Sequence, residues 1–298
     1  MVAAARAAGA QVVAVDRDEV DITDAGSCWQ LLHSDLYGSG DLYTTSDTHG
    51  SSNAKTSSAT SDVVVNCAAW TAVDAAESQE GPAFAVNAVG PANIARAASA
   101  IGARMVQIST DYVFAGDATQ PYVHDAPLAP ASAYGRSKAA GEWAVAANTA
   151  DYLLVRTAWL YGAGGPNFPK TMARLGASRD KLTVVSDQEG QPTWTADLAD
   201  LIVRLVAALA PTGIYHGTAS GASNWCQFAQ TVMTSAGLDC LVEPVTTAQY
   251  TATATGPQAH RPAYSVLGHQ SLTDIGIEPI GNWRQRWEQA APVVLASV

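Results

Sequence analysis

Short apolar runs alternate with helical patterns through the first half of the chain, and this alternation limits the possible folds most. The runs are QVVAV (11–15), DVVVN (62–66), RMVQI (104–108) and YLLVR (152–156). The helical patterns between them cover 24–32, 75–100 and 134–148. Continuous Val, Ile and Leu runs are typical of strands buried on both faces, so helices are expected on both sides of a parallel sheet. The pattern predicts an α/β fold, with a Rossmann-type doubly wound parallel sheet over residues 1–156.

Residues 157–298 are less regular and predict a smaller C-terminal substrate lobe. Strands are expected at 182–186 and 213–219, and helices at 196–210, 223–236 and 283–291. Thr195 is a candidate cap for the first of these helices. Because parts of this lobe come from several segments, we expect the two lobes to interleave without a linker.

Residues 34–61 fit neither lobe. They consist mostly of Ser, Thr, Gly, Asp and Asn. Such a segment buries too little apolar surface to offset the entropy lost on ordering. We therefore expect a mobile surface insert.

Charge and cysteine usage exclude several classes of protein. The net charge is −11 and the 16 basic residues are scattered, whereas a nucleic-acid groove needs clustered Lys and Arg. The four cysteines form no CxxC pair and have no His at metal-ligand spacing, which predicts free thiols and no metal site. No apolar stretch reaches the length of about 18 residues that a membrane helix needs. We expect a cytoplasmic protein that binds neither nucleic acid nor membrane.

Polar residues end one predicted strand, and a Tyr–Lys pair follows it. QIST ends the run at 104–108, and YGRSK places Tyr134 and Lys138 four residues apart on one helix face. A nearby ammonium favours the phenolate, so Lys138 is expected to lower the pKa of Tyr134. Ligands of open α/β sheets bind beyond the carboxyl ends of the strands, where Thr110 would face Tyr134. The three groups suit hydride transfer to a ketone, although a surface pair without function has the same spacing.

Several longer motifs carry a family resemblance. They are STDYVF (109–114), YxxxK (134–138), RTAWLYG (156–162), DQEGQPT (187–193), RPAYSVL (261–267), VDITD (20–24) and NCAAWTAVD (66–74). In this order they resemble the dTDP-4-dehydrorhamnose reductases of the extended short-chain dehydrogenase/reductase superfamily. The resemblance implies reduction of the 4-keto group of dTDP-4-dehydro-β-L-rhamnose to dTDP-L-rhamnose by NADPH or NADH. A dTDP-sugar is then the partner, and a homodimer is compatible with the resemblance.

The resemblance also assigns roles to residues. Tyr134 becomes the proton donor, Lys138 its partner and Thr110 the hydroxyl that orients the carbonyl. Substrate contacts are implied for Asp111, Trp159 and, as a diphosphate clamp, Arg261. Cofactor contacts are implied for Asp16, Asp21, Ile22, Ala68, Ala69 and Trp70, beside Tyr134 and Lys138. Structural readings stay open: Trp159 as core, Asp16 and Asp21 as strand ends, Arg261 as a solvated loop residue.

The chain departs from the family at its start. The family opens with a strand and a GxxGxxG turn, whereas MVAAARAAGA reads as the helix that follows that turn, with Gly9 as its C-cap. We expect the first strand to be missing and the working protein to begin upstream of Met1. Asp16 favours an unphosphorylated ribose and the adjacent Arg17 favours a 2′-phosphate, so the choice between NADH and NADPH stays open.

Two alternatives to a reductase remain at this point. One is an epimerase or dehydratase of the same superfamily, against which STDYVF and DQEGQPT argue. The other is a non-catalytic regulatory or binding subunit on the same fold, favoured by the lacking glycine turn and disfavoured by the intact Thr110, Tyr134 and Lys138. Turnover of a dTDP-keto-sugar distinguishes an enzyme from such a subunit.

Overall fold

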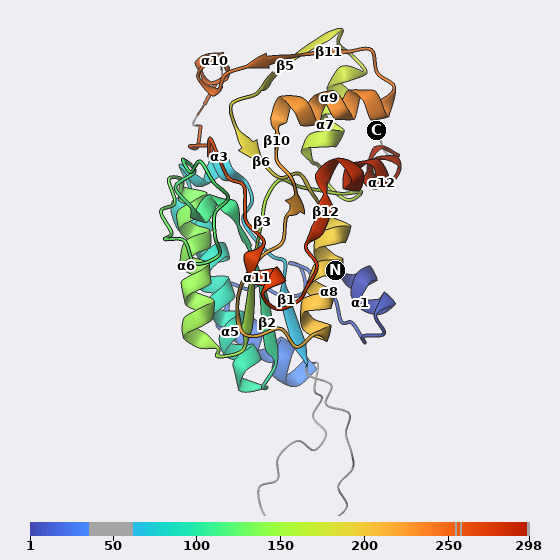
Figure 1. Cartoon of the computed structure of the whole chain (residues 1–298). Helices are drawn as coiled ribbons and strands as arrows, with labels where there is room; N and C mark the ends of the chain where they lie inside the picture. The colour runs from blue at the N-terminus through green and yellow to red at the C-terminus, as the bar shows by residue number, and fades with distance from the viewer. Residues whose placement is uncertain (36–61, 254, 257, 297–298) are drawn as a thin grey trace, which may run out of the picture.

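The computed structural model describes residues 1–35, 62–253, 255–256 and 258–296. Nearly all of the insert expected at 34–61 lies outside these residues. A four-stranded parallel sheet forms the centre of the first lobe (Figure 1). Its order is β1 (Val63–Asn66), β2 (Arg104–Thr110), β3 (Tyr152–Thr157) and β8 (Gly213–His216). The predicted doubly wound α/β fold is confirmed.

Alternation along the strands explains why helices cover both faces of this sheet. Met105 and Leu154 face the cluster under α5 (Gly90–Ala100) and α6 (Ala133–Asn148). Val106, Leu153 and Val155 belong to the opposite cluster, under α8 (Thr195–Ala207). Successive side chains of a strand point to opposite faces, so both sets are buried and each strand reads as a continuous apolar run. The short segments before α5 and α6 are α2 (Ala25–Gln30), η1 (Leu31–Asp35), α3 (Val73–Ala76), α4 (Glu80–Phe84), η2 (Ala85–Val89) and η3 (Asp111–Val113).

The strand predicted at 11–15 is wrong. Residues 11–15 have no strand structure, and Val13 and Val15 are 66% and 41% exposed. A strand is stable only when a neighbour satisfies its backbone and covers its side chains, and none of the described strands pairs with this segment. The helix before it, α1 (Val2–Ala7), does form, and Gly9 follows it with φ +85°.

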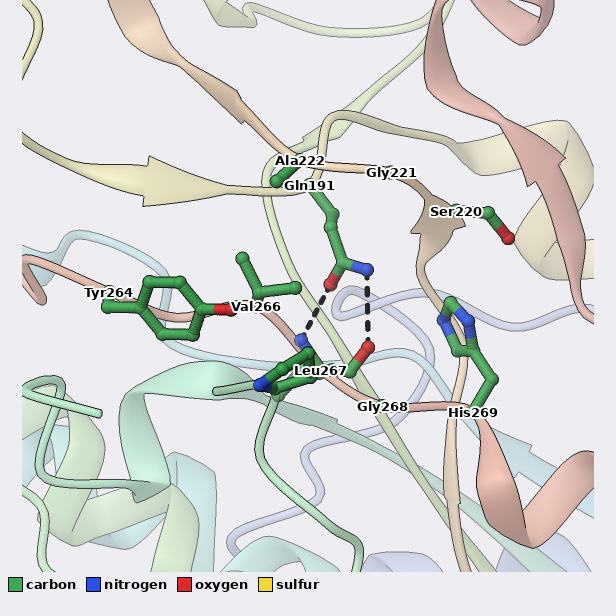
Figure 2. Close-up of a pocket in the computed structure, with 10 residues that line it drawn as sticks. Gln191, Ser220, Gly221, Ala222, Tyr264, Val266, Leu267, Gly268 and His269 are labelled. Carbon is green, nitrogen blue, oxygen red and sulfur yellow. Dashed lines mark hydrogen bonds between the residues drawn. The ribbon is translucent and has the colours of Figure 1, made fainter. Parts of the chain in front are cut away.

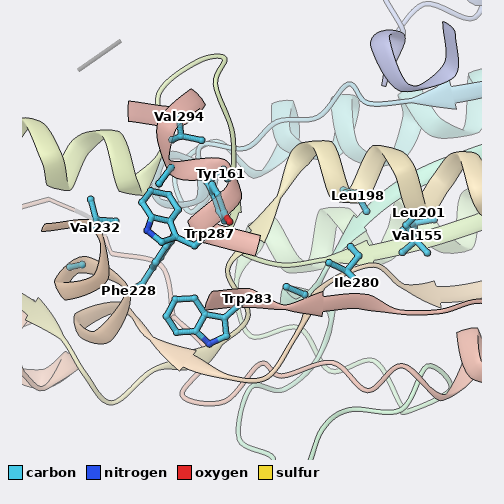
Figure 3. Packing of buried hydrophobic residues seen from close by; sticks show 14 of the residues in the cluster. Val155, Tyr161, Leu198, Leu201, Phe228, Val232, Ile280, Trp283, Trp287 and Val294 are labelled. Carbon is cyan, nitrogen blue, oxygen red and sulfur yellow. The ribbon is translucent and has the colours of Figure 1, made fainter. Parts of the chain in front are cut away.

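The second lobe packs around aromatic side chains. Tyr161, Phe228, Trp283 and Trp287 are almost fully buried and meet mostly edge to face, with ring centres 5.3 to 5.8 Å apart (Figure 3). This cluster continues to Val106 and the other residues under α8, so one core joins the two lobes. The lobe contains β4 (Leu160–Tyr161), α7 (Phe168–Gly176), β5 (Lys181–Val185), β6 (Glu189–Gly190), β7 (Thr193–Trp194), β9 (Ala219–Ser220), β10 (Ser223–Asn224), α9 (Trp225–Ala236), β11 (Leu241–Val245), α10 (Thr247–Thr253), α11 (Gln270–Thr273), β12 (Ile280–Asn282) and α12 (Trp283–Leu295).

Two local predictions have different outcomes. Thr195 was expected to cap α8, but it is the first helical residue, and Trp194 occupies the N-cap position without a side-chain bond. The four cysteines are free thiols, as predicted. None of the helices within the described residues is both long and apolar enough to cross a lipid bilayer.

Candidate active site

A hollow of about 440 Å³ lies beyond the carboxyl ends of β1, β2 and β3. It brings together five predicted catalytic and substrate residues, Thr110, Asp111, Tyr134, Lys138 and Trp159. Parallel strands end at one edge of a sheet, so residues distant in sequence converge there. The sequence-based expectation that Thr110 faces the same crevice as Tyr134 agrees with this geometry.

Thr110 and Asp111 occupy the junction between β2 and η3. Thr110 Oγ1 donates to Asp111 Oδ1 at 2.9 Å and accepts the N–H of Tyr112 at 3.3 Å. Asp111 is only 2% exposed. Burial raises the pKa of Asp111 to about 6, against hydrogen bonds that favour its charged form. A carboxyl with this pKa changes charge close to neutral pH.

Tyr134 and Lys138 lie on the first turns of α6. Ser132 begins this helix, since its Oγ accepts the N–H of Gly135 at 3.1 Å. Burial raises the pKa of Tyr134 to about 12, and a hydrogen bond with Thr110 opposes the rise. Burial also lowers the pKa of Lys138 to about 8.

The expected lowering of the Tyr134 pKa by Lys138 does not occur in this geometry. Lys138 Nζ donates to the carbonyl oxygen of Ile108 at 2.7 Å, so the ammonium is directed at β2. The effect of burial on the phenol exceeds the effect of any nearby positive charge, and the direction of the shift reverses. Tyr134 is therefore protonated at neutral pH, which is the form that a proton donor requires.

Trp159 forms an aromatic wall on the opposite side of the hollow. Its ring stacks on Trp225 with centres 3.6 Å apart, and Phe168 meets Trp225 at 4.6 Å. Trp159 adopts φ +48°, a conformation that bulky residues rarely take and that often marks functional sites. A Cβ at Gly190 would lie 2.5 Å from the Trp159 ring, so glycine is needed there. The reading of Trp159 as plain core does not fit a side chain that lines the hollow.

The DQEGQPT motif holds this wall in place. Gln188 Oε1 accepts the indole N–H of Trp225 at 3.1 Å, and Asp187 accepts the N–H of Thr247 at the start of α10. The side chain of Gln191 bonds the backbone of Leu267 in the RPAYSVL motif twice, as Figure 2 shows. Its Nε2 donates to the Leu267 carbonyl, and its Oε1 accepts the Leu267 N–H. Two motifs that are far apart in sequence thus form one framework behind the site.

The predicted cofactor residues divide into two groups. Ala68 and Ala69 line the hollow beside Tyr134 and Lys138. Trp70, Ile22, Asp16 and Asp21 do not line it. The Trp70 N–H is bound by Asn87 Oδ1 at 2.8 Å, and Ile22 packs against Gly90. Asp16 and Asp21 are exposed in the segment before α2.

Arg261 also lies outside the residues that line the hollow, in an ion pair with Asp74. Its Nη2 donates to Asp74 Oδ2 at 2.8 Å, and Asp74 Oδ1 accepts the N–H of Ala259 at 2.9 Å. These contacts join the NCAAWTAVD motif to the second lobe. Among the described residues, nothing bonds the buried Nη1 atom of Arg261. The role of Arg261 as a diphosphate clamp remains a prediction.

Several residues of the hollow were not predicted as site residues, among them Cys67, Tyr112, Phe168 and Trp225. Phe168 and Trp225 carry a detectable signal, because each is the first residue of a helix and follows an Asn N-cap, Asn167 or Asn224. Cys67 and Tyr112 lie inside recognised motifs, NCAAWTAVD and STDYVF. The residues predicted from these motifs were their neighbours Ala68, Ala69, Thr110 and Asp111.

A smaller hollow of about 330 Å³ lies beside the Gln191–Leu267 contact (Figure 2). It is bounded by Tyr264, Gly268, Ser220 and His269. The His269 ring bonds Thr218 Oγ1 at 2.9 Å, and burial lowers the His269 pKa. Within the described ranges, no three His, Cys, Asp or Glu side chains gather closely enough to hold a metal ion. The larger hollow is the candidate active site, because it contains the Tyr–Lys pair.

The fold and the site define a class, the Rossmann-type reductases with a second lobe over the strand ends. Comparison with known proteins narrows this class. The family model described as the RmlD substrate binding domain matches residues 1–294. A dTDP-4-dehydrorhamnose reductase of Streptomyces griseus is 48% identical over 237 residues, which cover 78% of this chain and 77% of the relative. A dTDP-4-keto-6-deoxy-D-glucose reductase of Streptomyces niveus is 38% identical over 298 aligned residues. The alignment covers 99% of this chain and 93% of the relative.

Solved structures agree with these relatives. A dTDP-4-dehydrorhamnose reductase of Bacillus anthracis in complex with NADP superposes with a TM-score of 0.81 at 35% identity, covering 93% of this chain and 88% of its own. The Clostridium acetobutylicum enzyme of the same name gives a TM-score of 0.83 at 36% identity, with 95% and 90% covered. The chain belongs to the dTDP-4-dehydrorhamnose reductase family. The family predicted from the motifs, and with it an NAD(P)H-dependent reductase, is confirmed.

Proposed function

We propose that this chain reduces the 4-keto group of dTDP-4-dehydro-β-L-rhamnose to give dTDP-L-rhamnose. The observation that carries the proposal is the convergence of Thr110, Tyr134 and Lys138 with Trp159 around one hollow. NADPH or NADH supplies the hydride when bound. Tyr134 and Lys138, with Ala68 and Ala69 beside them, are the described residues that would hold the nicotinamide end.

The chain's own groups then supply position and a proton. Thr110, at the end of β2, lies beside the phenol of Tyr134 and would orient the carbonyl oxygen of the substrate. Tyr134, protonated at neutral pH, donates its proton to the carbonyl oxygen as negative charge develops there. Lys138, fixed by the Ile108 carbonyl, supplies positive charge beside the donor. Trp159 and Trp225 line the crevice as a stacked pair, which would reduce the access of water to a bound substrate.

The sugar has two candidates, because the relatives differ in their printed names. The Streptomyces niveus relative, which covers 99% of this chain, is a dTDP-4-keto-6-deoxy-D-glucose reductase. The choice rests on the groups around C3 and C5 of the sugar, which the Trp159 side of the hollow would contact. Hydride transfer to C4 from the nicotinamide, with a proton from Tyr134, is common to both candidates.

The experiment measures turnover of each dTDP-keto-sugar by the full chain. The readout is the loss of absorbance as the reduced nicotinamide is oxidised. Calorimetric titration with NADPH and with NADH identifies the preferred cofactor. We expect cofactor binding without substrate and faster turnover of the dehydrorhamnose substrate. Cofactor binding without turnover of either sugar would instead support a regulatory or binding subunit.

The assembly and the compartment belong to the same proposal. We infer a cytoplasmic enzyme that binds no nucleic acid, and a homodimer is compatible with its family. Free thiols at Cys28, Cys67, Cys226 and Cys240 suit a reducing compartment. Light scattering of the purified chain tests the dimer, and a monomer at assay concentration would refute it.

A further inference from the structure

Helix α6 faces β2 with residues spaced four apart. Tyr134, Lys138 and Glu142 share this face, since residues one turn apart lie above one another. The first two contact β2 through Thr110 and the Ile108 carbonyl, as described above. The third makes a corresponding contact.

Glu142 bonds the β2 residue between those two. Ser109 Oγ donates to Glu142 Oε1 at 2.5 Å. Three consecutive residues of β2 therefore hold three successive turns of α6. Ser109 begins the STDYVF motif, yet neither the proton donor nor the substrate contacts account for it.

Arg156 completes the surroundings of Glu142. Its Nε and Nη2 donate to the two carboxylate oxygens at 2.9 and 2.7 Å, and both side chains are at most 3% exposed. Arg156 Nη1 donates to the carbonyl of His124 at 2.7 Å, and its guanidinium lies 4.9 Å from the centre of the Phe114 ring. Both carboxylate oxygens of Glu142 thus accept hydrogen bonds.

Stability alone does not explain this buried pair. Apolar residues of similar size often replace buried ion pairs without loss of stability, because desolvation offsets the attraction. The neighbours of Glu142 offer a functional reason for the pair. The nearest group of the proposed mechanism is Lys138, one helical turn away.

The charged and titratable groups that act on Lys138 come from two directions. Glu142, on the same helix, and Cys67, after β1, both raise the Lys138 pKa, while burial lowers it to about 8. From β2 only the neutral Ile108 carbonyl contacts Nζ. Arg156 on β3 acts through its pair with Glu142. Glu142 is thus the strongest influence that keeps Lys138 charged.

We propose that Glu142 is a positioning residue for the reduction, held by Arg156 and Ser109 so that Lys138 keeps its proton and its place beside Tyr134. The inference rests on the proposed function, because Glu142 acts through Lys138 and Tyr134. It assigns a role to Arg156, which begins the RTAWLYG motif, as well as to Ser109.

The first test is the pH profile of kcat for Glu142→Gln. Loss of the carboxylate charge should move the alkaline midpoint down by about one pH unit, since the two groups lie one helical turn apart. At pH 8 we expect kcat to fall about fivefold while KM changes less than about threefold, because the loss affects the chemical step. Lowering the pH should restore most of the activity.

A second variant protects the test against misfolding. Glu142→Gln leaves Arg156 with a poorer partner in the core, which destabilises the fold. Glu142→Met combined with Arg156→Met removes both charges and preserves volume, so the double variant should fold. It should show a smaller downward shift of the alkaline midpoint than Glu142→Gln, because the positive charge of Arg156 is lost together with the carboxylate.

Asp197→Asn is the matched control. Asp197 is also buried and pairs with Arg286 at 2.8 Å, but this pair joins α8 to α12 and lies outside the hollow. The control should lower the melting temperature and leave the pH profile unchanged.

The outcomes separate the inference from the function. The positioning role is overturned if a folded Glu142 variant loses the same fraction of its kcat at every pH. It is also overturned if kcat does not fall at all. Full activity of both Tyr134→Phe and Lys138→Met would instead overturn the proposed site itself.

Discussion

The two walls of the crevice differ in chemistry and in what holds them. The wall from β2 and α6 carries Thr110, Asp111, Tyr134 and Lys138, and burial shifts the pKa of three of these groups. The opposite wall consists of Trp159, Trp225 and Phe168. The first wall thus has titratable groups, and the second has an aromatic surface.

The supports behind the walls differ in the same way. Hydrogen bonds between neighbouring elements hold the polar wall, as in the Lys138–Ile108 contact. Ring stacking and close packing dominate at the aromatic wall, beside the single Gln188–Trp225 hydrogen bond, and a Cβ at Gly190 would already collide with Trp159. We therefore expect changes to the polar wall to alter kcat and pH dependence, and changes to the aromatic wall to alter KM.

The largest effect should come from Tyr134→Phe. Loss of the proton donor should lower kcat by at least about 100-fold, which is the usual contribution of a positioned acid. The melting temperature should stay within about 3 °C of that of the unaltered chain, since the change removes a single oxygen. Steady-state kinetics and calorimetry measure the two quantities.

Tyr161→Phe is the control for that substitution. The Tyr161 hydroxyl is buried outside the hollow and bonds no described residue. Its removal should leave kcat unchanged. Equal losses of activity in the two variants would contradict a special role for Tyr134.

The next effect concerns stability at the polar wall, through Asp111→Asn. The pKa of Asp111 is about 6 in the folded chain and 3.8 in the reference state, so the folded state holds the proton more tightly. Its contribution to stability is present below pH 4 and is lost as the pH rises through about 6. Asparagine stays neutral, so the variant should gain up to about 3 kcal/mol at pH 8.

Urea unfolding at pH 8 and at pH 4 measures this gain. The gain should shrink towards zero at the lower pH, while the activity of the variant falls at both. A gain of equal size at both pH values would show that burial of the charge is not its cause.

The smallest effect should appear on the aromatic wall, through Trp159→Ala. Loss of the ring should raise KM for the sugar nucleotide about tenfold, since an aromatic contact of this kind contributes about 1.4 kcal/mol. We expect kcat to change less than about threefold. Initial rates at varied sugar concentration separate the two constants.

Trp143→Ala provides the comparison, because Trp143 is 63% exposed on the outer face of α6. It should leave both constants unchanged. A fall in kcat without a rise in KM for Trp159→Ala would erase the proposed difference between the walls.

Local patterns in the sequence predicted most of the fold and the polar wall. The apolar runs at 62–66, 104–108 and 152–156 became β1, β2 and β3, because a buried parallel strand has a recognisable composition. The four-residue spacing of Tyr134 and Lys138 placed both on one helix face. The motifs identified the family that the comparisons confirm.

The same patterns were insufficient wherever a distant contact decided the outcome. Residues 11–15 have strand composition but no described strand beside them. The Arg261–Asp74 pair joins residues 187 positions apart. Trp225 entered the site through a stack on Trp159 that no spacing reveals.

The sequence by itself thus determined the class of fold, the family and the residue types of the polar wall. The tertiary structure decided which neighbours those residues have and how deeply they are buried. Burial reversed the expected direction of the Tyr134 shift, and a backbone carbonyl fixed Lys138. The physical reason is that spacing fixes local geometry, whereas desolvation and pairing depend on segments that meet only after folding.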